Sequence, residues 1–139
     1  MVEQRLYGIR GATGCINTVD DIEAQVRALY DGLLSLNKLP ESDIVSIFFT
    51  MTADLTACNP AAALRKQGRA QQCALFVCQE PHTDGALPGI IRILIHGYLP
   101  VGSNVQHLYR NGAEALRPDW AGTSGREGIF FINSDGKDP

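Results

Sequence analysis

The spacing of apolar residues predicts one long helix early in the chain. Over residues 18–37 they recur every three or four positions and form a single stripe: Ile22, Val26, Leu29, Leu33 and Leu36. Thr18 followed by Asp21 resembles an N-terminal capping box with Asp in place of Glu, and Pro40 follows the last turn. We therefore expect a helix that buries one face and leaves the other in water.

The remaining regular pattern predicts one short helix and four strands. Asn59 suits an N-cap and Pro60 the first helical position, so residues 60–67 are predicted to be helical. Runs rich in β-branched and aromatic residues predict strands, and they lie at residues 4–13, 44–52, 73–78 and 89–97. The last three runs are apolar at most positions, and we expect these strands to be buried on both faces.

The last third of the chain has a weaker pattern. Residues 102–116 could form a helix, but Asn111-Gly112 interrupts it. A short helical turn followed by a last strand, ending near Arg117, fits equally well. Beyond Asp119 the chain is polar and rich in Gly and Ser, apart from the apolar residues 129–132. We expect a mobile tail in which this apolar segment packs against the domain.

The order of these elements predicts an α+β fold, a mixed β-sheet packed with helices. A chain of 139 residues fits one domain. We place that domain at residues 1–119 and the C-terminal tail at 120–139. A small sheet leaves free edges and apolar surface, so oligomerisation is a natural way to complete it.

Composition excludes several classes of protein. The formal net charge of −3 argues against a nucleic-acid surface, and no segment approaches the ~18 apolar residues of a membrane span. The N-terminal residues lack the pattern of a signal peptide. The four cysteines show no CxxC spacing, and we expect them to be reduced, as in a cytoplasmic protein. The histidines are scattered, with no spacing that suggests a metal site.

The basic residues suggest the chemistry. Nine of the twelve are arginine, whose planar fork matches a carboxylate. Arg10 ends an apolar strand and Arg92 lies inside one, where a charge is costly without a partner. Together with Glu80 at a strand end, they suit a small polyanionic ligand. Read from position alone, Glu80 also fits a solvated acid at a strand end. The segment GIRGAT lacks the spacing of a dinucleotide-binding loop.

Three further residues join this set of candidates: Arg65, Tyr109 and Arg117. From position alone, Arg65 also fits a solvated charge on a helix surface, and Tyr109 also fits a packed aromatic. The sequence contains no convincing nucleophile, Ser/His/Asp set or P-loop beside them.

Several segments together resemble a known family. They are GIRGAT at 8–13, TMTADLTACNPAAALR at 50–65, VCQE at 77–80, Ile91-Arg92, and Tyr109 followed by LRPD at 116–119. In this combination and spacing the chain resembles the trimeric chorismate mutases of the Bacillus type. The resemblance covers about residues 5–119.

The resemblance implies a homotrimer, a trimeric pseudo-α/β-barrel, with its active sites in the clefts between subunits. It assigns catalysis to Arg92 at the ether oxygen of chorismate, to Glu80 at the ring hydroxyl, and to Arg10. Tyr109 would join Arg10 at the enolpyruvyl carboxylate, and Arg65 and Arg117 would steer the dianion. Further substrate-binding residues implied by the resemblance are Phe76, Val77, Cys78, Gln79, Asn59, Ala61 and Leu116. The reaction needs no cofactor and no metal.

The chain departs from the family pattern at three positions. The family usually has an aromatic residue at the position of Asn59, a lysine at Ala62 and a cysteine at Val77, where this chain has its cysteine one place later. Losing the lysine removes a charge near the ring carboxylate, so we expect it to affect affinity more than the reaction itself.

Two other functions remain open at this stage. One is a catalytically weakened trimer that binds chorismate-like dicarboxylates, which Asn59 and Ala62 would favour. The other is a trimeric imine deaminase of similar architecture, although its signature around an interface arginine is not found in the sequence.

Overall fold

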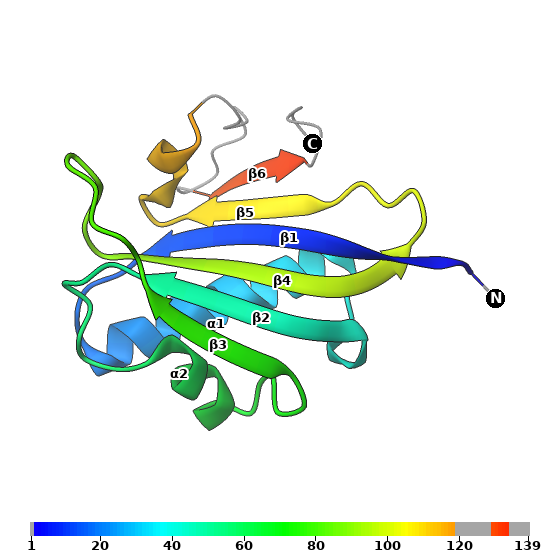
Figure 1. The fold of residues 1–139 in the computed structure, drawn as a ribbon, viewed down its shortest axis with the longest axis horizontal. Helices are drawn as coiled ribbons and strands as arrows, with labels where there is room; N and C mark the ends of the chain where they lie inside the picture. Colours follow the sequence, from blue (N-terminus) through cyan, green and yellow to red (C-terminus); the bar gives the residue numbers. More distant parts are fainter. Residues whose placement is uncertain (1, 119–128, 134–139) are drawn as a thin grey trace.

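The computed structural model describes residues 2–118 and 129–133, which form a six-stranded sheet with two α-helices and two short 3-10 helices. The order across the sheet is β3-β2-β4-β1-β5-β6 (Figure 1). The elements, in chain order, are β1 (Gln4–Gly14), α1 (Val19–Asn37), η1 (Glu41–Asp43), β2 (Ile44–Met51), α2 (Pro60–Lys66), β3 (Ala74–Gln79), β4 (Ile90–Pro100), β5 (Gln106–Arg110), η2 (Ala113–Leu116) and β6 (Ile129–Asn133).

The sheet is mixed, as the predicted α+β fold requires. β4 pairs antiparallel with β1 along its whole length, from Gln4 opposite Pro100 to Gly14 opposite Ile90. β4 also pairs antiparallel with β2, whereas β3 runs parallel to β2 and β5 parallel to β1. The two longest strands therefore lie side by side in the middle of the sheet and hold the shorter ones in register.

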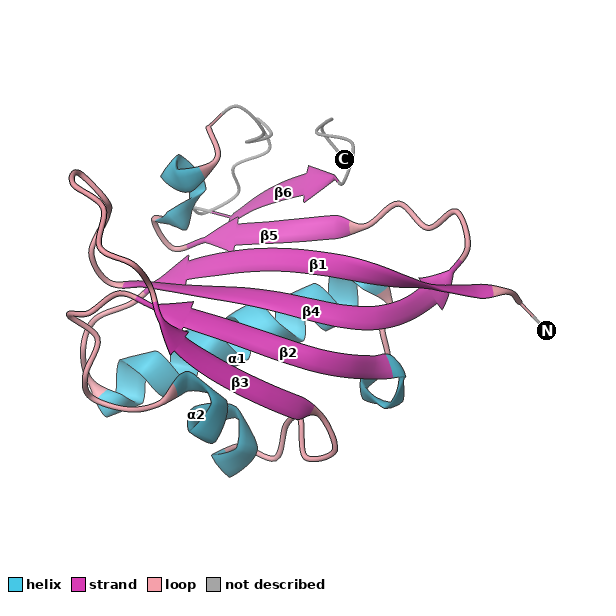
Figure 2. Cartoon of the chain, viewed as in Figure 1, coloured by secondary structure: helices cyan, strands magenta, loops and turns pink. Residues whose placement is uncertain are grey.

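The helices pack against one face of this sheet, and Figure 2 shows α1 crossing behind the strands. The predicted apolar stripe of α1 is buried, except that Leu36 is only half-buried. Gly11 lets α1 approach β1 closely, since a Cβ built there would lie 2.9 Å from Leu33 Cδ1 and 3.0 Å from Leu29 Cδ1. α2 joins the same core through Leu64 and Ala61.

The other face of the sheet is largely uncovered, which corrects one prediction. We expected β2 and β3 to be buried on both faces, yet Phe48 is 40% exposed and Phe76 is 60% exposed. The two rings lie opposite each other on the paired strands in an edge-to-face arrangement, with 6.2 Å between the ring centroids. Leu6 and Tyr98, which are also paired, are exposed as well. Aromatic and aliphatic runs do not by themselves distinguish a strand covered on one face from one covered on both.

The order of elements after residue 102 also differs from the prediction. The strand β5 comes first and the helical turn η2 follows it, the reverse of the order we expected. The reason is that Asn111 and Gly112 adopt positive φ angles of 52° and 94° and turn the chain after the strand.

The apolar segment of the predicted tail forms a strand. Ile129–Asn133 is β6, which pairs antiparallel with β5. The rest of the tail beyond Pro118 lies outside the described residues, so its predicted mobility and the domain boundary near residue 119 stay predictions. Within the described part of the chain, no helix is long and apolar enough to cross a membrane.

The start of α1 yields a test of the predicted cap. The Thr18 hydroxyl accepts a hydrogen bond from the Asp21 amide at 3.1 Å. We expect Thr18→Ala to lower the free energy of unfolding by about 1 kcal/mol, because it leaves a helix N–H without its partner. Thr18→Ser keeps the oxygen and should retain most of that stability. Urea denaturation of the three proteins measures this, and equal losses in both variants would contradict the assignment.

Candidate active site

The clearest polar feature of the sheet is an ion pair between two predicted catalytic residues. Arg92, the third residue of β4, donates from Nε to Glu80 Oε1 at 2.7 Å. The Arg92 side chain is 33% exposed and that of Glu80 only 15%. The Glu80 amide donates to the Met51 carbonyl at 2.8 Å, which fixes the backbone just after β3. A charge that looked costly inside an apolar strand therefore has its partner two strands away.

A third residue, which the sequence analysis missed, completes this pair. Thr50 lies on β2, directly opposite Arg92 on β4 and Cys78 on β3. Its hydroxyl donates to the same oxygen, Glu80 Oε1, at 2.8 Å. The sequence carried no signal for this contact, because it depends on the register of three strands.

The same row of paired positions continues across the sheet to Tyr109. Ala12 on β1 lies opposite both Arg92 on β4 and Tyr109 on β5, and side chains at directly paired positions project from the same face. Tyr109 is buried in a small cluster with Ala12, Ile90 and Ala113. The predicted substrate residue Leu116, on η2, packs against that cluster.

Arg10 lies two residues before Ala12, on the same face of β1, and its side chain is exposed. Its backbone amide donates to Nδ1 of the buried His107 at 2.9 Å. A ring nitrogen that accepts a hydrogen bond carries no proton, so this contact favours the neutral imidazole. Burial, and after it the charge of Arg10, lowers the pKa of His107 below its ordinary value of 6.5. His107 is thus a second residue near the site that sequence reasoning did not identify.

A second group of predicted residues gathers at the edge of the sheet, beside β3. Asn59, Val77, Cys78 and Gln79 line a cavity of about 250 Å³. Asn59 is also the N-cap of α2, because its Oδ1 accepts from the amides of Ala61 at 2.8 Å and Ala62 at 3.2 Å. Its oxygen therefore holds the helix, a role that the usual aromatic residue of the resembled family cannot play.

The remaining predicted residues are not joined to the ion pair within one chain. Ala61, in the first turn of α2, is buried, and Phe76 projects from the uncovered face of β3. Arg65 is exposed on α2, in the helical layer. Arg117 directly follows η2 and is half-buried. The chain thus presents two groups of candidates, one on the open sheet face and one at the edge formed by β3 and α2.

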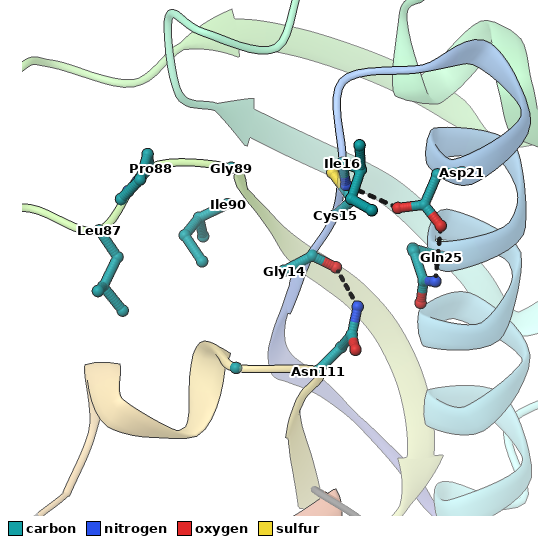
Figure 3. A pocket seen from close by; sticks show the side chains of 11 residues that line it. Gly14, Cys15, Ile16, Asp21, Gln25, Leu87, Pro88, Gly89, Ile90 and Asn111 are labelled. Atoms are coloured by element: carbon teal, nitrogen blue, oxygen red, sulfur yellow. Dashed lines mark hydrogen bonds between the residues drawn. The ribbon is translucent and has the colours of Figure 1, made fainter.

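Another cavity, of about 450 Å³, lies near the ends of β1 and β5 and is a poorer candidate (Figure 3). Its polar groups already bond to one another: Asp21 accepts from the Ile16 amide at 2.6 Å and from Gln25 at 3.1 Å, and Asn111 donates to the Gly14 carbonyl at 2.8 Å. None of the described residues that line it is basic. It therefore lacks what would hold a ligand with several carboxylates.

Comparison with known protein families gives a match over most of the chain. The family model described as chorismate mutase type I matches residues 6–120. The chain belongs to the type I chorismate mutase family.

Individual members of the family are similar over most of their length. Chorismate mutase AroH of Bacillus subtilis (strain 168) is 30% identical over 124 residues, which cover 88% of this chain and 98% of the relative. Chorismate mutase AroH of Thermus thermophilus is 32% identical over 117 residues, covering 80% and 95%. The solved chorismate mutase from Clostridium thermocellum has a TM-score of 0.72 and 37% identity, covering 78% of this chain and 98% of its own.

As a type I chorismate mutase the chain is an isomerase that acts on chorismate. This family membership confirms the resemblance seen in the sequence, and it favours neither the binding module nor the imine deaminase. The roles of individual residues are not settled by family membership and remain predictions at this point.

The buried His107 generates a prediction about stability and pH. The unfolded chain takes up a proton on this histidine near its ordinary pKa of 6.5, whereas the folded chain resists it to lower pH. The unfolded state therefore binds more protons below pH 6.5, so the contribution of His107 is fully present above this pH and is lost as the pH falls below it. One such proton changes the free energy of unfolding by at most about 1.4 kcal/mol per pH unit.

His107→Asn is the matched variant, because its side-chain oxygen can still accept the Arg10 amide but does not titrate. Urea denaturation between about pH 7.5 and about pH 5.5 should show a smaller loss of stability in the variant than in the wild type. Identical losses in the two proteins would show that His107 does not resist protonation in the fold.

Proposed function

We propose that the chain catalyses the rearrangement of chorismate to prephenate, in aromatic amino-acid biosynthesis, at a site built around Arg92 and Glu80. The observation that carries this proposal is the partly exposed ion pair on the open face of the sheet, with 2.7 Å between Arg92 Nε and Glu80 Oε1. A charged pair held in place and still reachable from solvent suits a reaction driven by electrostatics.

The reaction itself asks for position and charge rather than proton transfer. In this concerted Claisen rearrangement the ether C–O bond breaks while a new C–C bond forms within the same molecule, so no proton or group leaves. The protein has to hold the compact conformer of the substrate and stabilise the negative charge that grows on the ether oxygen. A preorganised donor at such an oxygen is worth roughly 3–4 kcal/mol of barrier.

Arg92 is suited to supply that donor. Its Nε is engaged by Glu80. Of the four N–H bonds on the terminal nitrogens, one lies parallel to Nε–H and the other three point away from that edge of the guanidinium. The ion pair fixes the plane of the guanidinium before the substrate arrives. Its donors can therefore meet the ether oxygen without reorganising.

Glu80 would act through its second oxygen. From the described residues, both hydrogen bonds that its carboxylate accepts go to Oε1. Oε2 is then the atom that can accept a hydrogen bond from the ring hydroxyl. The same negative charge would favour the partial positive charge that develops on the ring fragment as the ether bond breaks.

The substrate carboxylates call for additional cations. Arg10, exposed on β1, would bind the enolpyruvyl carboxylate. Tyr109 on β5 is buried in the cluster with Ala12, so only its hydroxyl would contact the same carboxylate. Arg65 and Arg117 would attract the dianion and help to close the site. Position 62 carries alanine and is exposed, so the ring carboxylate would meet one fewer cation than in the usual family pattern.

A homotrimer with shared sites is also part of this proposal. Leu6, Tyr98, Phe48 and Phe76 leave apolar surface on the open face of the sheet, and exposed patches of this kind mark interfaces. The cavity lined by Asn59 and Cys78 lies at the β3 edge of the sheet, whereas Arg10 and Tyr109 lie beyond Arg92, on β1 and β5. A neighbouring subunit that brings its own β3 edge to the open face would complete the cleft.

We also infer a cytoplasmic location. All four cysteines lie in the described part of the chain and are free, as expected in a reducing compartment. Burial raises the pKa of the Cys15 thiol to about 11, which keeps this cysteine unreactive.

The proposed trimer can be tested at Phe48. Phe48→Glu places a charge on the apolar face of the sheet and should dissociate the trimer and abolish most of the activity. Val19→Glu is the control, because Val19 is an equally exposed apolar residue in the first turn of α1, on the helical side. Sedimentation equilibrium and chorismate turnover measure both effects. A wild-type monomer with full activity would refute the shared site.

The proposed role of Arg92 can be tested by replacing its planar guanidinium with another positively charged group. Arg92→Lys keeps the charge but loses the planar fork, and it should lower kcat by at least roughly 10²-fold while the trimer stays intact. Arg117→Ala should instead mainly raise KM, because we place Arg117 in substrate capture. The loss of chorismate absorbance in the ultraviolet measures both constants. If Arg92→Lys raises KM and leaves kcat unchanged, Arg92 is only an anion clamp.

A further inference from the structure

We infer that Thr50 is a positioning residue of the reaction, which holds the Glu80 carboxylate, and through it the Arg92 guanidinium, in the one orientation that leaves donors free for the substrate. This inference rests on the proposed function and concerns the same site. Its basis is that a single oxygen, Glu80 Oε1, accepts both from Thr50 Oγ1 at 2.8 Å and from Arg92 Nε at 2.7 Å.

Thr50 is itself held firmly. It lies on β2, between β3 and β4, with Cys78 paired on one side and Arg92 on the other. Its backbone is therefore fixed by two ladders, and its branched side chain has little freedom at χ1. Thr50 is half-buried, and its hydroxyl points toward Glu80, which follows the end of β3.

The hydroxyl decides which oxygen of Glu80 is used. The terminal torsion of a glutamate is soft, so a carboxylate bound only by Arg92 could rotate about it and exchange its two oxygens. With Oε1 bound by two donors from different strands, Oε2 has a defined position. That oxygen is the one we assign to the ring hydroxyl of chorismate.

The hydroxyl also decides how Arg92 is used. Arginine and carboxylate commonly form a bidentate pair, in which two parallel N–H groups bind two oxygens. Here the contact is made by Nε to a single oxygen. A carboxylate released from Thr50 could turn to the bidentate arrangement, which would take a terminal N–H away from the ether oxygen. Thr50 thus protects the donor that lowers the barrier.

Thr50→Val and Thr50→Ser separate this role from a structural one. Valine keeps the volume and the strand preference of threonine but lacks the hydroxyl, whereas serine keeps the hydroxyl. We expect Thr50→Val to lower kcat for chorismate by about tenfold or more with little change in KM, because the interaction lost acts in the transition state. Thr50→Ser should stay within about threefold of the wild type, since it restores the bond.

Ser46→Ala is the matched control. Ser46 carries a hydroxyl on the same strand, and that hydroxyl contacts His96 Nδ1 at 3.0 Å instead of Glu80. Its removal should leave kcat unchanged. Sedimentation and thermal unfolding confirm that each variant is assembled, and Thr50→Ala replaces Thr50→Val if the latter does not fold.

A double-mutant cycle with Glu80 distinguishes the positioning role of Thr50 from a purely structural one. In the background of Glu80→Ala there is no carboxylate to position, so Thr50→Val should change kcat by less than about twofold. Full additivity of the two substitutions, or a kcat of Thr50→Val equal to that of the wild type, would overturn the inference and leave the proposed function standing. A wild-type protein that does not convert chorismate would overturn the proposed function, and this inference with it.

Discussion

Two helices cover only one face of the six-stranded sheet, and the other features of the molecule depend on that asymmetry. On the covered face, α1 and α2 build the core with the inward side chains of the strands. On the open face, the same strands expose Phe48 and Phe76 near one edge and carry Arg92 near the centre. Exposed apolar residues and the candidate charged site therefore occupy one surface, as the proposed site between subunits requires.

The polar side chains on that face form hydrogen bonds with one another, because Arg92 and Thr50 both donate to Glu80. Arg92 would be costly in a central strand if it were alone, and the carboxylate of Glu80 offsets that cost while remaining only 15% exposed. Thr50 then limits the carboxylate to one orientation. Such an ion pair is already in place before the substrate binds. A reaction without proton transfer can be accelerated by charges that are fixed in this way.

The structure explains the departure from the family pattern at Asn59 and shows what surrounds the one at Ala62. Asn59 uses its side-chain oxygen to cap α2, so this position serves the helix in this chain. Lys66, on the last turn of the same helix, pairs with Glu23 of α1 at 2.8 Å and joins the two helices. That lysine is engaged in helix packing, so it does not replace the cation missing at Ala62.

The sequence by itself determined the elements whose signals are local. The stripe and cap of α1, the Asn59-Pro60 start of α2 and the apolar runs of the strands all predicted their elements, because helix and strand periodicity are properties of neighbouring residues. Motif spacing also identified the family and drew attention to Arg92 and Glu80. Only the tertiary structure decided what depends on packing and strand register: which face of β2 is open, that Thr50 reaches Glu80, and that His107 reaches the Arg10 amide. Register is set by pairing between distant strands, and a shift of one residue would turn every side chain to the opposite face.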